Sequence, residues 1–147
     1  MEKVDFNCIF CAIVAKRAPA AIVYESEAAI AFLDISPGIE GHTLVIPKKH
    51  FRNLYDIDDE NAKAVMHAAR IVAHALHAAF NAEGMTVLQS SERAGGQVVF
   101  HYHAHLAPRF IGDGLMSREG NERRVQWRAR GNATRDELDK IADRIRA

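Results

Sequence analysis

Three histidines, His101, His103 and His105, occupy alternate positions in the segment VVFHYHAHLAPR, residues 98–109. The apolar residues around them predict a β-strand, and alternate side chains of a strand point to the same face. Three imidazoles on one face could bind a metal ion together, or could act as a nucleophile with helpers at a phosphate group. We disfavour an incidental polar face, because histidine is not a favoured strand residue. The spacing leaves the two functional interpretations open.

The residues directly upstream, Gly95, Gly96 and Gln97, favour close approach to an anion. Glycine lets the backbone come near a ligand, and backbone N–H groups can donate to a phosphate. A second segment, GHTLVIPKKH at residues 41–50, contains two more histidines on a predicted strand, His42 and His50. A site that draws imidazoles from two strands is therefore expected.

The chain has two cysteines, Cys8 and Cys11, in the sequence CIFC. Their spacing is typical of one half of a zinc site, and two further ligands would have to come from distant parts of the chain. The alternative is a redox pair. That motif normally opens a helix after a strand, and position 8 leaves little room for this arrangement.

The three remaining histidines, His67, His74 and His77, fall on the polar side of a predicted long helix. A solvated helix face carries such residues by default. His74 and His77 could hold a metal at i, i+3 spacing, but we prefer the solvated face.

The balance of charge excludes several classes of partner. Among 147 residues, 19 are Lys or Arg and 19 are Asp or Glu, which gives no support for nucleic-acid or anionic-membrane binding. No apolar run approaches the roughly 18 residues of a membrane span. The first residues, MEKVDFNC, lack the apolar core of a signal peptide. We therefore expect a cytoplasmic protein with no nucleic-acid or membrane partner and with reduced thiols.

Short strands and one long helix must position these residues. Strands are expected at 22–24, 29–34, 41–47, 85–91 and 98–109. The long helix runs from about Asp58 to Ala82, with apolar residues at helical spacing, acidic residues at its start and Gly84 at its end. Strands joined by short turns, with a long helix, predict an antiparallel α+β domain.

The C-terminal part of the chain is predicted to be a polar loop followed by a helix. Residues 112–133 read as an extended loop, with a short strand around Val125–Trp127. Thr134 to Glu137 form a capping box that opens the final helix. Its apolar face consists of Leu138, Ile141, Ala142 and Ile145.

The two histidine segments, together with CIFCAI and AFLDISP, resemble the histidine-triad (HIT) superfamily of nucleotide hydrolases and transferases. The signature of that family is His-x-His-x-His flanked by apolar residues. The match runs from about Asn7 to Phe110 and is closest to bacterial Hint-like members. The resemblance implies a single HIT domain over residues 1–147, with its core at about 7–110 and a C-terminal loop and helix at 111–147. Its fold would be a roughly five-stranded antiparallel sheet with one long helix and a C-terminal helix.

The resemblance also implies a catalytic role for four residues. His103 would attack the α-phosphorus of a nucleotide and form a covalent nucleotidyl-histidine, which water then hydrolyses. His105 would donate to a phosphate oxygen as charge develops. Gln97 would contact the scissile bridge or orient water, and His42 would support the triad from the neighbouring strand.

Nucleotide binding is implied for a further set of residues. Asp34 in FLDISP would accept bonds from both ribose hydroxyls, which favours a purine ribonucleotide substrate. The remaining expected contacts to base and phosphate, beside Gln97, His103 and His105, are Phe10, Ile13, Phe32, Ile35, Ser90, Gly96 and Val99. Ser90 and Ser91 stand where relatives often have two asparagines, so a hydroxyl would replace an amide there.

A structural zinc ion is implied by the CxxC-bearing relatives. Its four ligands would be Cys8, Cys11, His50 and His101, a closed Cys2His2 set. The chemistry assigned to His103 requires no catalytic metal.

The resulting prediction is a homodimeric enzyme that acts on AMP conjugates, above all purine nucleoside phosphoramidates. In the dimer, the long helix and a strand form the interface, and Trp127 would reach the partner's active site. The alternatives are a dinucleoside polyphosphate hydrolase of the Fhit-like branch, a nucleotide-binding regulatory module, and a zinc protein in which the whole triad binds metal.

Overall fold

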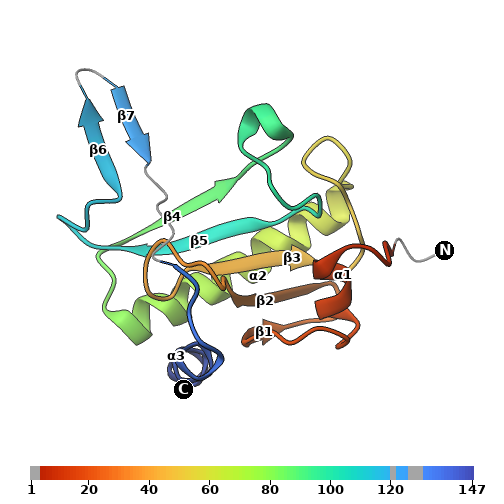
Figure 1. Ribbon diagram of the computed structural model, residues 1–147, viewed down its shortest axis with the longest axis horizontal. Helices are drawn as coiled ribbons and strands as arrows, with labels where there is room; N and C mark the ends of the chain where they lie inside the picture. The colour runs from red at the N-terminus through yellow and green to blue at the C-terminus, as the bar shows by residue number, and fades with distance from the viewer. Residues whose placement is uncertain (1–3, 120–121, 126–130) are drawn as a thin grey trace.

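Five strands form one antiparallel sheet in the computed structural model, which describes residues 4–119, 122–125 and 131–147. The strands are β1 (Ile22–Glu25), β2 (Ala29–Leu33), β3 (Thr43–Pro47), β4 (Gly84–Gln89) and β5 (Ala104–Arg109). Their order across the sheet is β1-β2-β3-β5-β4 (Figure 1). The predicted α+β fold with five antiparallel strands is confirmed.

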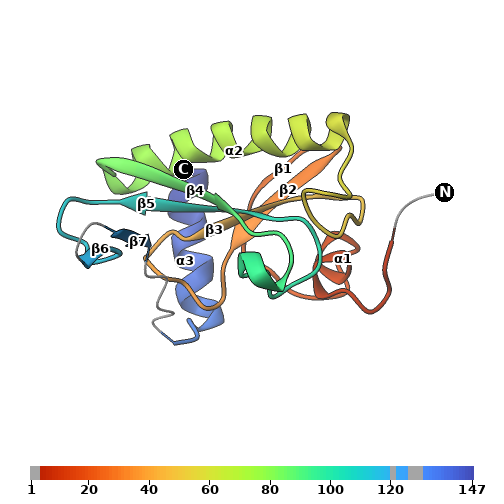
Figure 2. The same cartoon turned by 90° about the horizontal axis from the view of Figure 1, so that it is seen from above.

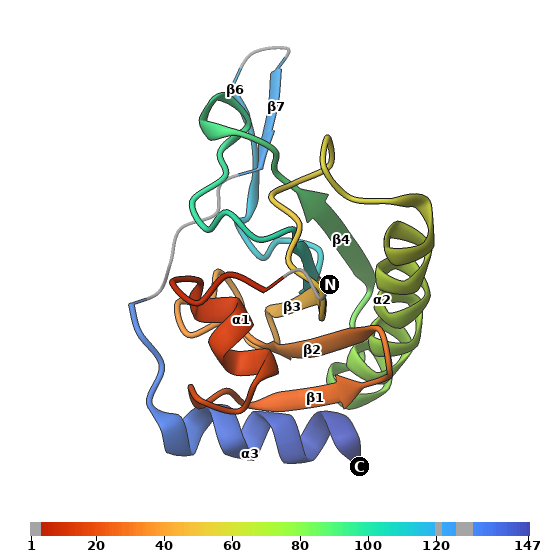
Figure 3. The same cartoon turned by 90° about the vertical axis from the view of Figure 1, so that its right-hand side faces the viewer.

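Helices cover both faces of this sheet. α2 (Asp59–Phe80) lies on one face and the short α1 (Ile9–Val14) on the other, while α3 (Arg135–Arg146) runs along β1 (Figures 2 and 3). Because strand side chains alternate, Ala31, Leu33 and Val45 pack in the core beside α2. Their neighbours Ile30, Phe32, Leu44 and Ile46 pack with α1. Each face of the sheet therefore has its own apolar core.

The long helix begins as predicted but ends earlier. Asp58 accepts a hydrogen bond from the Asn61 backbone N–H at 2.8 Å, as an N-cap residue does. The predicted end at about Ala82 is two residues late, and Gly84 is not the residue that ends the helix. Asn81 ends the helix in the left-handed conformation (φ 51°), which asparagine adopts more readily than most residues, and Gly84 is the first residue of β4. His67, His74 and His77 are exposed, as expected for a solvated face.

The strand that carries the triad is shorter than predicted, because residues 98–103 lie outside the sheet. Ala104 is the first residue that pairs with both neighbours, Val45 of β3 and Gln89 of β4. Just before it, the Tyr102 N–H donates to the Phe51 carbonyl at 2.6 Å, which belongs to the loop after β3. The chain thus joins the sheet only after His103, although the side chains of His101 and His103 are both buried.

The N-terminal helix α1 was not predicted. It begins directly after Cys8, whose sulfur accepts the Cys11 backbone N–H at 3.4 Å. The CxxC segment therefore does open a helix, but no strand precedes it among the described residues.

The C-terminal helix agrees with its predicted capping box. Thr134 and Glu137 exchange side-chain to backbone hydrogen bonds, and Leu138, Ala142 and Ile145 are buried. The predicted loop before it contains a two-stranded hairpin, β6 (Met116–Glu119) and β7 (Glu122–Val125), and the predicted short strand overlaps β7 at Val125. Trp127 lies outside the described residues. Within the described part of the chain, no helix has the length and apolar character needed to cross a membrane.

Candidate active site and metal centre

Two cysteines and two histidines meet where α1, the loop after β3 and the segment before β5 come together. The Cys11 sulfur lies 3.3 Å from His50 Nδ1 and 3.6 Å from His101 Nδ1, and the Cys8 sulfur lies 3.5 Å from His101 Nδ1. All four donor atoms lie within 4.8 Å of one another. Zn–S and Zn–N bonds of about 2.3 and 2.0 Å at tetrahedral angles place sulfur and nitrogen about 3.5 Å apart. The donors therefore have the spacing of a tetrahedral zinc site.

The ring of His101 is oriented by a hydrogen bond on its other nitrogen. Nε2 lies 2.9 Å from the carbonyl oxygen of Pro47, so Nε2 carries the proton and Nδ1 presents its lone pair to the thiols. Burial lowers the pKa of His101 to about 4, which keeps the ring neutral. Burial also raises the pKa of Cys11 to about 11, so a thiolate at this position requires a bound cation.

His103 is held in one tautomer by the backbone. Its Nδ1–H donates to the carbonyl oxygen of His101 at 2.7 Å. In the neutral ring, Nε2 therefore carries no proton and has an available lone pair. The ring is 7% exposed and packs edge to face against Phe10, with centroids 5.3 Å apart. Burial lowers the pKa of His103, although the bond to His101 opposes this. A neutral imidazole with an available Nε2 is the form that can attack phosphorus.

His42, directly before β3, and His105 of β5 form a hydrogen-bonded pair. The Gly38 N–H donates to His42 Nδ1 at 3.1 Å, so the proton of a neutral His42 is on Nε2. His42 Nε2 lies 2.9 Å from His105 Nδ1, which must then accept. His105 consequently carries its own proton on Nε2. Burial lowers the pKa of both rings to about 4.

Asp34 lies at the end of β2 beside this pair. One carboxylate oxygen accepts the Ser36 N–H at 2.8 Å, and the other lies 3.7 Å from His42 Nε2. Burial raises the pKa of Asp34, and the bond from Ser36 opposes this effect. Asp34, His42 and His105 have the proximity of metal ligands. However, the 2.9 Å contact between the two rings fits a shared proton better than two bonds to one ion.

Gln97 lies in the segment before β5 and is buried. Its amide nitrogen donates to the carbonyls of Arg52 and Val99, at 2.7 and 3.1 Å. Its oxygen accepts from the Glu92 N–H at 2.8 Å and from the Asn53 amide at 3.2 Å. The side chain thus joins two loops, and its predicted contact to the scissile bridge remains a prediction.

The other predicted nucleotide contacts fall into two groups. Phe10, Ile13 and Phe32 are buried in the apolar core beside α1, and Val99 packs against that core. Ile35 is 62% exposed on the loop after Asp34. Ser90 lies beside Gly96, since a Cβ added to that glycine would lie 3.7 Å from the Ser90 hydroxyl oxygen. Phe10 alone among the core members has ring contacts to both His101 and His103.

Sequence reasoning missed the polar network that braces the segment before β5. Arg52 pairs with both carboxylate oxygens of Glu92 at 2.8 and 2.9 Å, and the buried Asn53 donates to the same carboxylate at 2.7 Å. The Arg52 guanidinium also stacks on Phe100, 4.3 Å from the ring centroid. These residues come from two loops, so neither periodicity nor a motif could have joined them.

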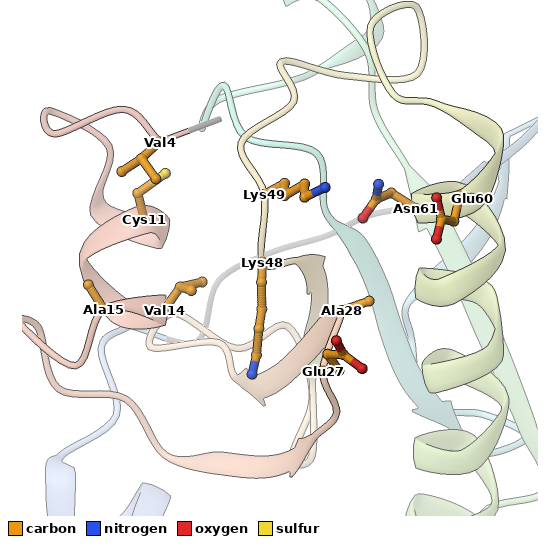
Figure 4. A pocket seen from close by; sticks show the side chains of 10 residues that line it. All are labelled: Val4, Cys11, Val14, Ala15, Glu27, Ala28, Lys48, Lys49, Glu60 and Asn61. Atoms are coloured by element: carbon orange, nitrogen blue, oxygen red, sulfur yellow. The ribbon is translucent and has the colours of Figure 1, made fainter. Parts of the chain in front are cut away.

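A cavity of about 610 Å³ lies between α1 and the start of α2, behind the metal centre (Figure 4). Cys11 lines it, together with Lys48 and Lys49 from the loop after β3 and with Glu60 and Asn61 from α2. Lys48 also pairs with Glu25 at 3.0 Å. The cavity borders the cysteine side of the site, away from the His42–His105 pair.

Comparison with known proteins gives a consistent result. The family model "HIT domain" matches residues 15–112. The chain is similar to Protein hit of Bacillus subtilis, with 50% identity over 110 residues, 74% of this chain and 76% of the relative. It is also similar to the solved structure of a Zn-bound histidine triad family protein from Mycobacterium smegmatis, with TM-score 0.78, 33% identity and coverage of 95% and 91%. A HIT family hydrolase from Legionella pneumophila gives TM-score 0.63 and 32% identity, with coverage of 74% and 98%.

Proposed function

Because the chain belongs to the HIT domain family, we propose that it is a nucleotide hydrolase or nucleotidyl transferase acting at the α-phosphate of AMP conjugates. Purine nucleoside phosphoramidates are the substrates we expect. The observation that carries this proposal is the paired tautomers of His103 and His105. His103 keeps an unprotonated Nε2 while its neighbour, 4.9 Å away between ring centroids, carries a proton on Nε2.

The chemistry proceeds in two steps. His103 Nε2 attacks the α-phosphorus, a P–N bond to the ring forms, and the bond to the leaving group breaks. His105 Nε2–H donates to a phosphate oxygen as negative charge develops. Water then attacks phosphorus, the bond to His103 breaks, and the nucleoside monophosphate is released. The leaving group departs with a proton, which the consumed water replaces.

Substrate positioning rests on residues around these rings. Asp34 accepts the ribose hydroxyls, which its half-buried carboxylate beside His42 makes feasible. Phe10, Ile13, Phe32 and Ile35 contact the base, and Ser90, Gly96, Gln97 and the backbone N–H at Val99 contact the phosphate. Gln97 must exchange some of its present loop contacts to do so.

Zinc is proposed as a structural ion. The donor set fits a closed Cys2His2 site, since three of its sulfur–nitrogen distances lie between 3.3 and 3.6 Å. Cys8, Cys11, His50 and His101 would hold the ion, which supplies a cross-link between α1 and the segments around the sheet. Both cysteines are free thiols, so we expect the protein in a reducing compartment, the cytoplasm.

We also propose that residues 1–147 form one domain and that two copies form a dimer. The domain proposal rests on α3, which packs against β1 and α2 although it lies outside the family match. The dimer proposal rests on β4, which forms one edge of the sheet and exposes half of Val87. An open strand edge favours pairing with another chain. The side of α2 next to β4 would complete the interface, and the mass in solution, from light scattering, should be that of two chains.

The test is turnover of adenosine 5′-phosphoramidate and diadenosine tetraphosphate, side by side. Wild type should release AMP from the phosphoramidate, and His103→Ala should lose at least about 1,000-fold in kcat, as expected for a nucleophile. The exposed His67 provides a matched control, because His67→Ala removes an imidazole far from the site. Preference for the dinucleotide would keep the mechanism but change the substrate class. Turnover retained in His103→Ala would refute the proposal.

A further inference from the structure

His103 and His105 are anchored in different ways, although only one residue separates them. His105 belongs to β5 and pairs with Leu44 of β3 on one side and Leu88 of β4 on the other. His103 precedes Ala104, the first residue of the strand, and lies outside this ladder. The sheet therefore fixes the backbone of His105 directly, whereas the backbone of His103 depends on the loops around it.

His101 belongs to both sites at once. Its ring lies in the metal centre, with Nδ1 at 3.5 and 3.6 Å from the two sulfurs. Its backbone carbonyl accepts the Nδ1–H of His103 at 2.7 Å. The His101 ring is fully buried and its Nε2 is hydrogen-bonded to the Pro47 carbonyl, so it has little room to turn about its Cα–Cβ bond, and a displacement of the ring is passed in part to this carbonyl.

The helix α1 provides a second connection. Cys8 is its N-cap and Cys11 lies in its first turn, so the metal centre holds the start of this helix. Phe10 lies between the two cysteines and packs against the rings of His101 and His103, with centroids 5.9 and 5.3 Å apart. The wall against which His103 rests is thus carried by the same metal ligands.

We propose that metal occupancy of the Cys8–Cys11–His50–His101 centre positions His103, fixing its orientation and tautomer, while leaving the His42–His105 pair unaffected. The metal centre is then a positioning element for the nucleophile and more than a cross-link of the fold. The importance of this coupling for catalysis rests on the proposed function, but the coupling itself concerns the ring of His103 and is measurable without turnover. Of the four ligands, Cys11 borders the cavity between α1 and α2.

The experiment follows the ring nitrogens of the full chain labelled with ¹⁵N-histidine, at one fixed pH. Spectra are recorded for the zinc-loaded protein, after removal of the ion with a chelator, and after reloading. We expect the His103 Nδ1–H to exchange with water about two- to tenfold faster in the metal-free protein, the factor that corresponds to loss of one hydrogen bond. A second tautomer should also become visible for His103. The signals of His42 and His105 should stay unchanged, because Gly38 and the β-ladder hold them, and reloading should restore His103.

Two further samples keep the test independent of overall unfolding. Cadmium in place of zinc leaves the centre filled but lengthens its bonds, so the His103 signals should shift while those of His105 do not. Cys8→Ser should reproduce the metal-free spectrum, whereas Ile9→Ser, at a neighbouring residue that is 53% exposed, should reproduce the wild-type spectrum.

Either of two results would overturn the coupling. In one, the ion is lost and His103 keeps its slow exchange and single tautomer. In the other, all histidine signals change together, which would mean that the ion holds the whole fold. Failure of the proposed function is separate, since it would be seen as turnover that persists in His103→Ala whatever the spectra show.

Discussion

The metal centre and the His42–His105 pair each contain two imidazole rings, but the groups next to the ring nitrogens differ between the two sites. In both, burial lowers the imidazole pKa, to about 4 for His101, His42 and His105. In the metal centre, His101 faces two sulfurs at 3.5 and 3.6 Å. In the pair, a ring faces another ring at 2.9 Å. A neutral imidazole serves either purpose, and its neighbours decide which.

In each case, the position of one backbone group determines which ring nitrogen carries the proton. The Pro47 carbonyl accepts a hydrogen bond from His101 Nε2–H, so Nδ1 has a lone pair that could bind a metal. The His101 carbonyl accepts a hydrogen bond from His103 Nδ1–H, so Nε2 carries no proton. The Gly38 N–H occupies His42 Nδ1 and directs the remaining proton toward His105. Backbone hydrogen bonds thus give chemically identical rings the different tautomers that the proposed roles of ligand, nucleophile and donor require.

The largest expected effect comes from removing a thiol from the metal centre. Cys11→Ser should lower zinc affinity by more than about 100-fold, since even loss of an outer-shell partner can cost that much. It should also lower the unfolding temperature, because the ion stabilises the folded state. Zinc content by elemental analysis and thermal unfolding with and without chelator measure both. Full zinc retention in this variant would support the alternative in which the triad itself holds the metal.

Acid should weaken the His42–His105 pair next. Both rings have a folded pKa of about 4 against an ordinary 6.5. Between these values the unfolded chain binds more protons, so the stability from keeping the rings neutral is complete above about pH 6.5 and is lost as pH falls toward 4. Denaturant unfolding across this range should show a free energy of unfolding that decreases with acidification.

The contribution of the pair can be separated from acid release of zinc. His42→Gln removes one titrating ring and keeps the four metal ligands, so its free energy of unfolding should depend less steeply on pH than that of wild type. His67→Ala removes an exposed ring and should keep the wild-type slope. Equal slopes in all three proteins would mean that the pair does not titrate as its burial implies.

A smaller, more selective effect is expected from Asp34→Asn. The amide keeps the shape of the carboxylate and can still accept the Ser36 N–H, but it loses the charge that binds two hydroxyls. Hydrogen bonds to a charged group are worth about 1.5–3 kcal/mol each, so KM should rise about tenfold or more for a ribonucleotide substrate. Discrimination against the 2′-deoxy substrate should shrink, which paired kinetics would show. An unchanged preference for ribose would remove Asp34 from the proposed site.

The smallest effect is expected for a histidine outside both sites. His67→Ala changes an exposed residue of α2, and such substitutions usually alter stability by less than about 0.5 kcal/mol. Zinc content and turnover should equal those of wild type. A loss of zinc or of turnover in this variant would show that the exposed His67 of α2 also contributes to one of the two buried sites.

Local sequence patterns predicted which helices and strands form better than they predicted where each one begins and ends. The apolar spacing from Val65 to Leu76 predicted the long helix, because one buried stripe repeats every three to four residues. The helix end was misplaced because Gly84 and Asn81 are both residues that favour a left-handed conformation, and the choice depended on where β4 pairs. The short α1 was missed because six residues carry too little periodicity to be recognised.

The amino-acid sequence alone shows which chemical groups are available and much of their order along the chain. Alternation of His101, His103 and His105 with apolar residues predicted one imidazole-bearing side, and the CxxC spacing predicted half of a metal site, because both depend only on neighbours along the chain. Likewise, the capping box at Thr134 was readable from four consecutive positions.

Tertiary contacts determine which of these groups lie in the metal centre and which tautomer each ring adopts. His101 and His103 precede the first residue of β5, the Tyr102 N–H between them donates to the Phe51 carbonyl, and the His101 ring faces Cys8, Cys11 and His50. The tautomer of His101 depends on the distant Pro47 carbonyl, whereas those of His42 and His103 depend on backbone groups four and two positions away. The Pro47 contact joins residues 54 positions apart, and the contact between Cys8 and His101 joins residues 93 positions apart. No local pattern encodes them, because they exist only once the sheet and α1 have brought distant backbone groups within hydrogen-bond reach.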